Sequence, residues 1–126
     1  MVTATTQGVK ISVETFFQPD VSNAVEFVFA YRITIENKSE STIKLLRRHW
    51  YIFDGIGIWR EVEGEGVVGE QPVITPGGLH QYVSGCHLKA SVGKMFGTYE
   101  MERQTDEFLF EVKIPEFLMI TPFMLN

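Results

Sequence analysis

The chain has 126 residues, enough for one ordinary domain, and we predict a single domain over residues 1–126. Hydrophobic residues make up 44% and charged residues 21%, values typical of a globular protein, which excludes a disordered or fibrous chain. Eleven Lys and Arg against sixteen Asp and Glu give a net charge of -5, which argues against nucleic acid as the main partner.

Cysteine usage and hydropathy indicate the compartment. The only cysteine is Cys86, so no internal disulfide can form, and Met1–Gln7 lacks the basic-then-apolar pattern of a targeting segment. Together these features favour the reducing cytoplasm. No uncharged apolar run approaches the roughly 20 residues needed to cross a bilayer, so we expect no membrane insertion.

Alternation with a period of two dominates the chain, and it places one apolar face of a strand on a core. In chain order, alternating, β-branched or aromatic runs predict strands at 9–14, 27–35, 43–54, 93–103 and 108–114, with shorter candidates at 73–75 and 79–84. Turn residues separate these runs, and no segment of ten or more residues combines helical spacing with caps. The pattern favours an antiparallel sandwich or barrel. We interpret the apolar tail after Ile114 as a cover strand or a partner-docking tail.

Gly64, Gly66 and Gly69 form a G-x-G-x-x-G pattern, which cradles a pyrophosphate when a strand precedes it and a helix follows it. Pro72, Pro76 and the β-branched residues between them exclude a helix after Gly69, and the glutamates of this segment would repel phosphates. We therefore favour a structural interpretation, in which the glycines permit positive φ in a tight connection between strands. Anion binding by a nest of backbone amides is the alternative.

The segment around these glycines is also the most acidic part of the chain. Runs of like charge usually face water, so we interpret Glu61, Glu63, Glu65 and Glu70 as a solvated edge, with weak Mg²⁺ association as the alternative. No His-x-x-x-His or Cys-x-x-Cys spacing occurs. We predict neither a metal site nor a cofactor.

Arg47, Arg48, His49 and Trp50 form the most unusual local group. Alternation places Arg47 and His49 on one face of a strand and Arg48 and Trp50 on the other. If exposed at a sheet edge, the group forms a recognition patch; otherwise, stacking on aromatic rings or pairing with carboxylates makes it structural.

Residues 84–87 supply Ser, Cys and His without a strand-to-helix elbow, so we predict no catalytic set and a protein that is not an enzyme. We interpret the cysteine as a small buried hydrophobe.

Several blocks of residues, among them Leu-Leu-Arg-Arg-His-Trp at 45–50, resemble the ApaG (CorD) family and follow one another in the order of that family over nearly the whole chain. The blocks lie at 29–37, 45–50, 61–72, 76–77, 82–85, 93–99 and 114–117. The resemblance implies an all-β fold, an antiparallel β-sandwich of the fibronectin type III or immunoglobulin-like type. It also implies a genetic association with cobalt and magnesium efflux, a protein-interaction role, and a pyrophosphate site that would fall on Gly64, Gly66 and Gly69.

Our leading functional hypothesis is a non-enzymatic binding module that recognises a protein partner through a face or an edge of the sandwich. A contiguous aromatic patch on the folded surface, formed by Trp59, Phe96 or Phe123, would favour it. Unpaired edge strands invite pairing, so a homodimer is a further expectation.

The alternative hypothesis is a site for a nucleotide, a pyrophosphate or a divalent cation at the loop of residues 64–69. A hydrolase ranks below both hypotheses. It would require a cavity that holds His49 or His87 beside a carboxylate or beside the hydroxyl group of Ser84.

Overall fold

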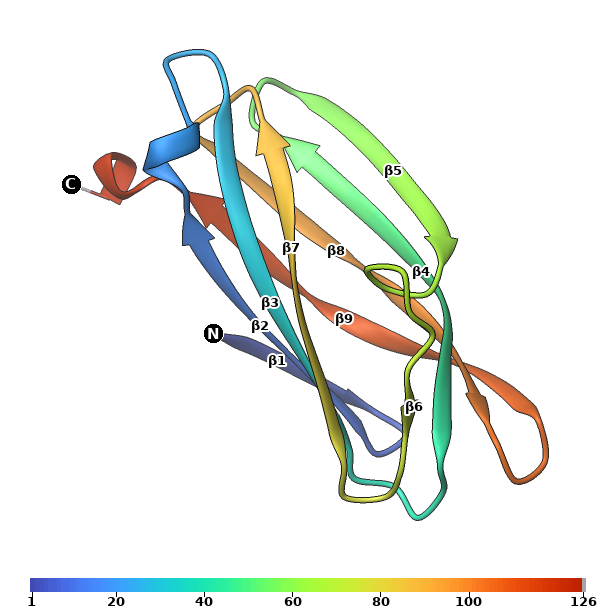
Figure 1. Cartoon of the computed structure of the whole chain (residues 1–126). Coiled ribbons are helices and arrows are strands. Elements are labelled where there is room, and N and C mark those ends of the chain that lie inside the picture. The colour runs from blue at the N-terminus through green and yellow to red at the C-terminus, as the bar shows by residue number, and fades with distance from the viewer. Residues whose placement is uncertain (126) are drawn as a thin grey trace.

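Antiparallel strands form the fold in the computed structural model, which describes residues 1–125 (Figure 1). The strands are β1 (Val2–Thr6), β2 (Val9–Phe17), β3 (Phe27–Asn37), β4 (Ile43–Asp54), β5 (Ile58–Glu65), β6 (Val73–Ile74), β7 (Leu79–Leu88), β8 (Val92–Arg103) and β9 (Phe108–Ile120). Short 3-10 turns follow β2 and β9, at Pro19–Val21 and Pro122–Leu125. Within residues 1–125, no helix has the length and apolarity that crossing a membrane requires.

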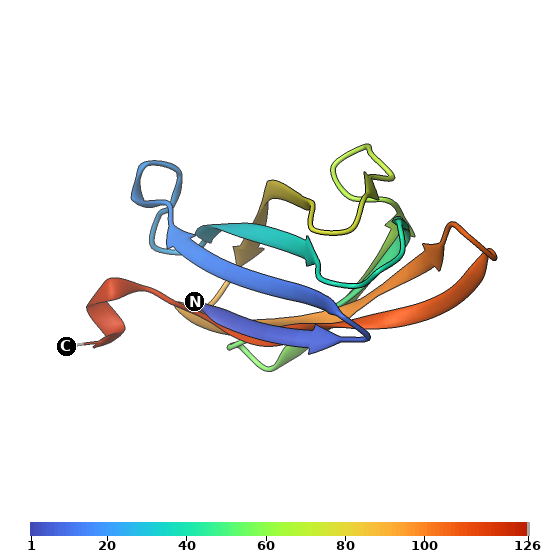
Figure 2. The same cartoon turned by 90° about the horizontal axis from the view of Figure 1, so that it is seen from below.

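The strands pair into two sheets that pack face to face, and Figure 2 shows the two layers from below. The four-stranded sheet has the order β1-β2-β3-β7. The five-stranded sheet has the order β5-β4-β8-β9, and β6 pairs with β4 beyond the end of β5. This arrangement confirms the predicted all-β fold, an antiparallel β-sandwich.

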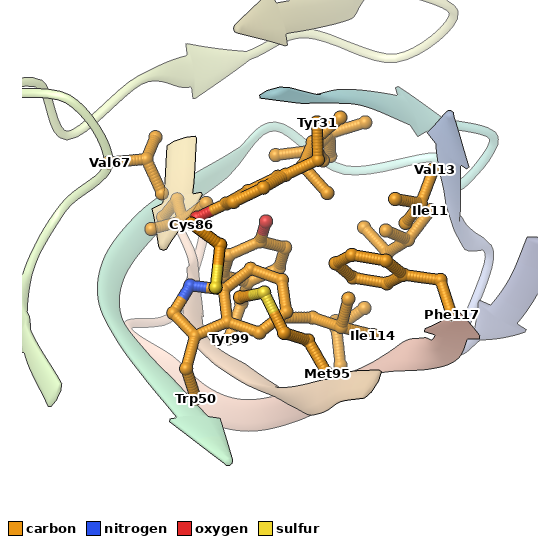
Figure 3. Close-up of a cluster of buried hydrophobic side chains, with 14 of the residues drawn as sticks. Ile11, Val13, Tyr31, Trp50, Val67, Cys86, Met95, Tyr99, Ile114 and Phe117 are labelled. Atoms are coloured by element: carbon orange, nitrogen blue, oxygen red, sulfur yellow. The ribbon is translucent and has the colours of Figure 1, made fainter. Parts of the chain in front are cut away.

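Alternate residues of each strand supply the core between the sheets. Ile11 on β2 and Ile33 on β3 are fully buried, whereas their sequence neighbours lie on the opposite face. From the five-stranded sheet, the ring of Trp50 packs edge-on against that of Tyr31, with 5.5 Å between the ring centroids (Figure 3). Burial of each large apolar side chain contributes about 1.5–3 kcal/mol, so the period-two alternation is the main cause of the sandwich.

Two strands of the structure, β1 and β5, have no counterpart among the predicted strands. β1 is rich in threonine and pairs only with β2, so it buries little of its surface. β5 contains three of the four glutamates that the sequence indicated as a solvated edge, and it is an exposed edge strand of its sheet. A search for alternating apolar residues therefore misses an edge strand whose side chains are mostly polar or acidic.

The apolar tail belongs to the sheet as far as Ile120. Phe117 and Met119 are buried, so the cover-strand interpretation of the tail is the correct one over this stretch. Pro115 does not end the strand, because it lies where the register against β8 shifts between Met95 and Gly97. A proline is tolerated at such a bulge on an edge strand, where its missing N–H group breaks no ladder.

The two flanks of the sandwich differ. On one flank β1 lies beside β9, and the amide of Lys113 donates a hydrogen bond to Thr6 Oγ1 over 3.2 Å. On the other flank the edge strands are β7 and β5, and side chains of both line cavities between the sheets. The sandwich is therefore closed along one flank and grooved along the other.

Candidate functional site

An aromatic cluster covers part of the solvent-facing side of the five-stranded sheet. It consists of Tyr51 and Phe53 on β4, Trp59 on β5 and Phe96 on β8; we call these four residues the aromatic face. Successive ring centroids lie 4.9 Å apart for Phe53 and Trp59, 6.0 Å for Trp59 and Phe96, and 5.3 Å for Phe96 and Tyr51. The four rings therefore form one contiguous surface cluster.

Strand pairing explains why these rings meet. In the antiparallel ladder Phe53 is opposite Trp59, and Tyr51 is opposite Phe96 on the other side of β4. Side chains that are directly opposite across a ladder lie close enough for aromatic rings to pack. The sequence search named Trp59 and Phe96 but missed Tyr51 and Phe53. The signal that could have found them is the alternation through the second part of β4, after the bulge between Leu45 and Arg47, where the even positions face the core and the odd positions face solvent.

Phe123 does not join this cluster. Its ring packs near Phe27, with 6.3 Å between centroids, at the far end of the other sheet. Of the three aromatic residues that the sequence nominated, the structure therefore brings together Trp59 and Phe96 only.

His49 continues the aromatic face toward the acidic part of β5. Its ring stacks on Tyr51 with 4.6 Å between centroids. Nδ1 of His49 lies 3.2 Å from a carboxylate oxygen of Glu63, and Nε2 lies 3.5 Å from one of Glu61. The carboxylates flank the imidazole from two sides, and Ser84 belongs to the opposite sheet. Of the two arrangements named for a hydrolase, the structure therefore brings His49 beside carboxylates but does not bring it together with the hydroxyl group of Ser84.

Charged side chains border the aromatic face. Lys94 lies over the ring of Trp59, with 5.8 Å from Nζ to the centroid, and its Nζ is 3.3 Å from a carboxylate oxygen of Glu116. On the His49 side, Arg47 lines a shallow depression of about 150 Å³ together with Glu63, Glu100 and Glu111. Carboxylates outnumber cations around this border, so the rim of the aromatic face is acidic.

The group of residues 47–50 is divided between the two faces of β4, as alternation predicts. Arg47 is exposed and His49 lies on the solvent-facing side, whereas Trp50 is only 3% exposed and packs in the core. Arg48 points to the inner side as well and lines the cavities beside Trp50. Of the predicted recognition patch, Arg47 and His49 therefore lie on the solvent-facing side of β4, whereas Arg48 and Trp50 do not.

The glycine loop of residues 64–69 contains no helix and is followed by β6. Gly66 and Gly69 have φ values of +62° and +77°, so both occupy the left-handed region that favours glycine. A Cβ atom on Gly66 would lie 2.1 Å from the carbonyl oxygen of Glu70, which no side chain tolerates. Gly64 has an ordinary backbone and instead leaves room for Arg48, whose Nη1 would lie 3.1 Å from an added Cβ.

Most amides of this loop already have acceptors within the protein. The N–H of Gly66 donates to the carbonyl of Leu46 over 2.8 Å, and Val67 and Glu70 exchange N–H···O bonds of 2.7 and 3.0 Å. Beyond the end of β5, Val68 and Gly69 are the described loop residues whose amides donate no main-chain hydrogen bond of this kind. A nest that binds an anion uses several convergent free amides, so this geometry gives little support to a phosphate cradle.

The ionisable groups do not converge on a metal. Among residues 1–125, no group of three or more His, Cys, Asp or Glu side chains could hold an ion. Cys86 is buried, and this burial raises the pKa of its thiol, which suits a packed hydrophobe better than a nucleophile. His87, the adjacent residue, is exposed on the opposite face and pairs with Glu26 over 2.6 Å.

Comparisons with known proteins identify the family. The model of the ApaG domain matches residues 18–103. The chain is 46% identical over 124 residues to Protein ApaG of Paramagnetospirillum magneticum, covering 97% of this chain and 95% of the relative, and 44% identical to Protein ApaG of Nitrosomonas europaea, covering 94% of each. A crystal structure of a Bordetella pertussis protein designated ApaA is similar with a TM-score of 0.87 and 39% identity, covering 90% of this chain and 94% of that one. The chain therefore belongs to the ApaG family.

Proposed function

We propose that the protein is a non-enzymatic binding domain that recognises a protein partner through the aromatic face of its five-stranded sheet. The observation that carries the proposal is the contiguous packing of Tyr51, Phe53, Trp59 and Phe96 on the solvent side of the sheet, with Trp59 54% exposed. Exposed aromatic clusters bordered by polar residues are typical of protein–protein interfaces.

The shape and charge of this surface indicate the kind of partner. The aromatic face is borne on a sheet and its neighbouring depression is shallow, so it suits a protein surface better than a small ligand. Glu61, Glu63 and Glu116 border it, with Lys94 as the nearest cation. We therefore expect a partner with an apolar or aromatic centre and basic side chains around it.

We also propose which partners the domain binds in the cell and in which compartment. The family resemblance associates ApaG proteins with cobalt and magnesium efflux, so components of that process are the first partners to test. We expect the interaction to take place in the cytoplasm, because the sequence has one cysteine and that cysteine is buried. The aromatic face could instead bind a second copy of the same chain. The oligomeric state of the purified protein distinguishes this self-association from binding of a different protein.

The test is capture of a partner by the immobilised protein, followed by titration of the purified partner. Trp59→Ala is expected to weaken binding by about thirtyfold or more, since a central aromatic anchor contributes about 2 kcal/mol or more. Val83→Ala is the matched control, because Val83 is 56% exposed on the opposite sheet. Equal affinity of Trp59→Ala and the wild type, with the same partner, would contradict the proposal.

The alternative is a small ligand at the glycine loop, and its strongest support is the positive φ of Gly66 and Gly69. A ligand that binds the native state raises the melting temperature, with a gain of about 2.7 kcal/mol at a hundred times the dissociation constant. We expect nucleotides, pyrophosphate, Mg²⁺ and Co²⁺ to leave the melting temperature unchanged. A saturable rise that Gly69→Val abolishes would support the loop site instead.

A further inference from the structure

A cleft opens between the sheets along the flank formed by β5 and β7. Two adjoining cavities, of about 360 and 200 Å³, share the side chains of Tyr31, Arg48, Trp50 and Ser84. These residues come from β3, β4 and β7, so both sheets contribute to the walls. We call this space the inter-sheet cleft, and it lies on the side of β4 opposite to the aromatic face.

Arg48 brings a positive charge into the inter-sheet cleft. Its Nη1 donates to the carbonyl oxygens of Glu65 over 3.0 Å and Gly66 over 3.1 Å, which fixes the guanidinium against the glycine loop. These acceptors are neutral, and within residues 1–125 no carboxylate forms an ion pair with Arg48. The remaining N–H donors of this guanidinium have no acceptor in the described part of the chain. A charged group at the margin of an apolar space with no counter-ion attracts an anion.

The second arginine of the cleft differs from Arg48 in this respect. Nη2 of Arg60 donates to the carbonyl of His87 over 2.8 Å, and Nη1 lies 3.9 Å from the buried carboxylate of Asp54. Asp54 itself accepts hydrogen bonds from the amides of Lys89 and Ala90. Arg60 is therefore compensated within the protein, and the cleft holds one unbalanced positive charge, that of Arg48.

The other walls of the cleft are mostly apolar, with a few neutral polar groups. Trp50, Ile52 and Met95 form its floor, and Val67 closes one end near the glycine loop. Figure 3 shows Tyr31, Trp50 and Val67 around this part of the core. Tyr31, Tyr82 and Ser84 bring neutral hydroxyl groups to the part of the cleft that Arg48 lines, and that of Tyr82 is hydrogen-bonded to Tyr99. Such a mixture of apolar walls and few polar groups is typical of a small-molecule site.

We propose that the inter-sheet cleft binds a small carboxylic acid with an aromatic or aliphatic body, its carboxylate paired with Arg48. One unbalanced guanidinium matches one negative charge, and its free N–H donors match the geometry of a carboxylate. A nucleotide or pyrophosphate brings two or more charges, which this cleft would leave uncompensated. The apolar body of the ligand would contact Trp50 and Met95.

The test uses phenylacetate as the probe and the uncharged phenylacetamide as its matched comparison. The protein has two tryptophans, so a Trp59→Phe background isolates the fluorescence of Trp50. We expect a saturable change in this fluorescence with phenylacetate, and a dissociation constant about tenfold or more higher for phenylacetamide, since hydrogen bonds to charged groups are the strong ones. A peptide with a free C-terminal phenylalanine is titrated in parallel. Tighter binding of phenylacetate than of the peptide indicates a free acid as the ligand, and tighter binding of the peptide indicates the C-terminal carboxylate of a chain.

Three variants separate the role of Arg48 from a general effect on folding. Arg48→Gln is expected to weaken phenylacetate binding by about tenfold or more, whereas Arg47→Gln, on the opposite face of the same strand, is expected to leave it unchanged. Ser84→Leu keeps the charge and fills the cleft, so it should also weaken binding, and it tests the site independently if Arg48→Gln unfolds. No saturable signal with phenylacetate, equal affinity for phenylacetamide or inorganic phosphate, or wild-type binding by Ser84→Leu would overturn the proposal.

Discussion

The indole ring of Trp59 packs against the phenyl ring of Phe96 at an interplanar angle of 79°, although β4 separates their two strands. On β4, Phe53 packs against Trp59 and Tyr51 packs against Phe96, so the cluster extends across three strands. Because each ring is held by a neighbour, the cluster loses little side-chain freedom when a partner covers it. A surface that is ordered before binding favours tight association.

The two tryptophans should affect folding stability very differently. Trp59→Ala removes a ring that is 54% exposed, so we expect a loss of about 1 kcal/mol or less in the free energy of unfolding. Trp50→Ala leaves a cavity in the core, with an expected loss of about 3–5 kcal/mol. Urea denaturation followed by circular dichroism measures both. Comparable losses would show that the aromatic face belongs to the structural core.

Two strand glycines provide a test of the close approach between β4 and β8. A Cβ atom on Gly97 would lie 2.0 Å from the carbonyl oxygen of His49, whereas one on Gly85 would have its nearest contact at an ordinary 3.6 Å. We expect Gly97→Ala to reduce the free energy of unfolding by about 3 kcal/mol or more, and Gly85→Ala to change it by less than about 1 kcal/mol. Thermal unfolding of the two variants distinguishes them, and equal melting temperatures would be evidence against the close contact.

Stability should fall at alkaline pH. Burial raises the pKa values of Tyr31, Tyr82 and Tyr99, and Tyr82 and Tyr99 also share a hydrogen bond between their hydroxyl groups. In the unfolded chain tyrosines ionise near pH 10, while the folded protein keeps these protons to higher pH. The unfolded state therefore binds fewer protons above about pH 10, and the free energy of unfolding decreases as pH rises.

Melting temperatures between about pH 8 and pH 11 measure this alkaline decrease. Tyr99→Phe removes one of the buried ionisable groups and should make the decrease shallower. A melting temperature that stays constant over this range, or an equally steep decrease in Tyr99→Phe, would show that the buried tyrosines do not cause the loss of stability at alkaline pH.

The thiol of Cys86 should be unreactive in the folded protein. It is 4% exposed and burial raises its pKa, with Arg60 only partly opposing that shift. At neutral pH we therefore expect no rapid reaction with a disulfide reagent, and complete reaction of the one cysteine after denaturation. Rapid labelling of the native protein would place the sulfur atom in contact with solvent.

The period-two pattern was sufficient to predict the sandwich because each core strand buries one complete face. β-Branched and aromatic residues predicted β4 with its observed bounds, and strand alternation placed Arg47 and Arg48 on opposite faces. The period-two pattern gave no such result for the neighbouring strand, β5, where Trp59 and three glutamates share the solvent side while Arg60 and Val62 face the cleft. Neither face of that strand is uniformly apolar, so periodicity alone gives no signal.

The candidate sites were less predictable because they depend on which strands become neighbours. Tyr51 and Phe96 are 45 positions apart and meet only through the pairing of β4 with β8. The cleft around Arg48 likewise needs Ser84 from the opposite sheet. The G-x-G-x-x-G pattern is prominent in the sequence, yet much of it serves local packing: Gly66 closes a turn and Gly64 makes room for Arg48.

The most direct test of the protein-binding proposal is nuclear magnetic resonance mapping of the surface that an identified partner covers. On addition of the unlabelled partner, we predict that the largest changes in side-chain and amide signals fall on Tyr51, Phe53, Trp59 and Phe96, with Val83 on the opposite sheet unaffected. Changes confined to Val83 and its strand β7, or to the glycine loop, would contradict the proposal that the aromatic face is the binding surface.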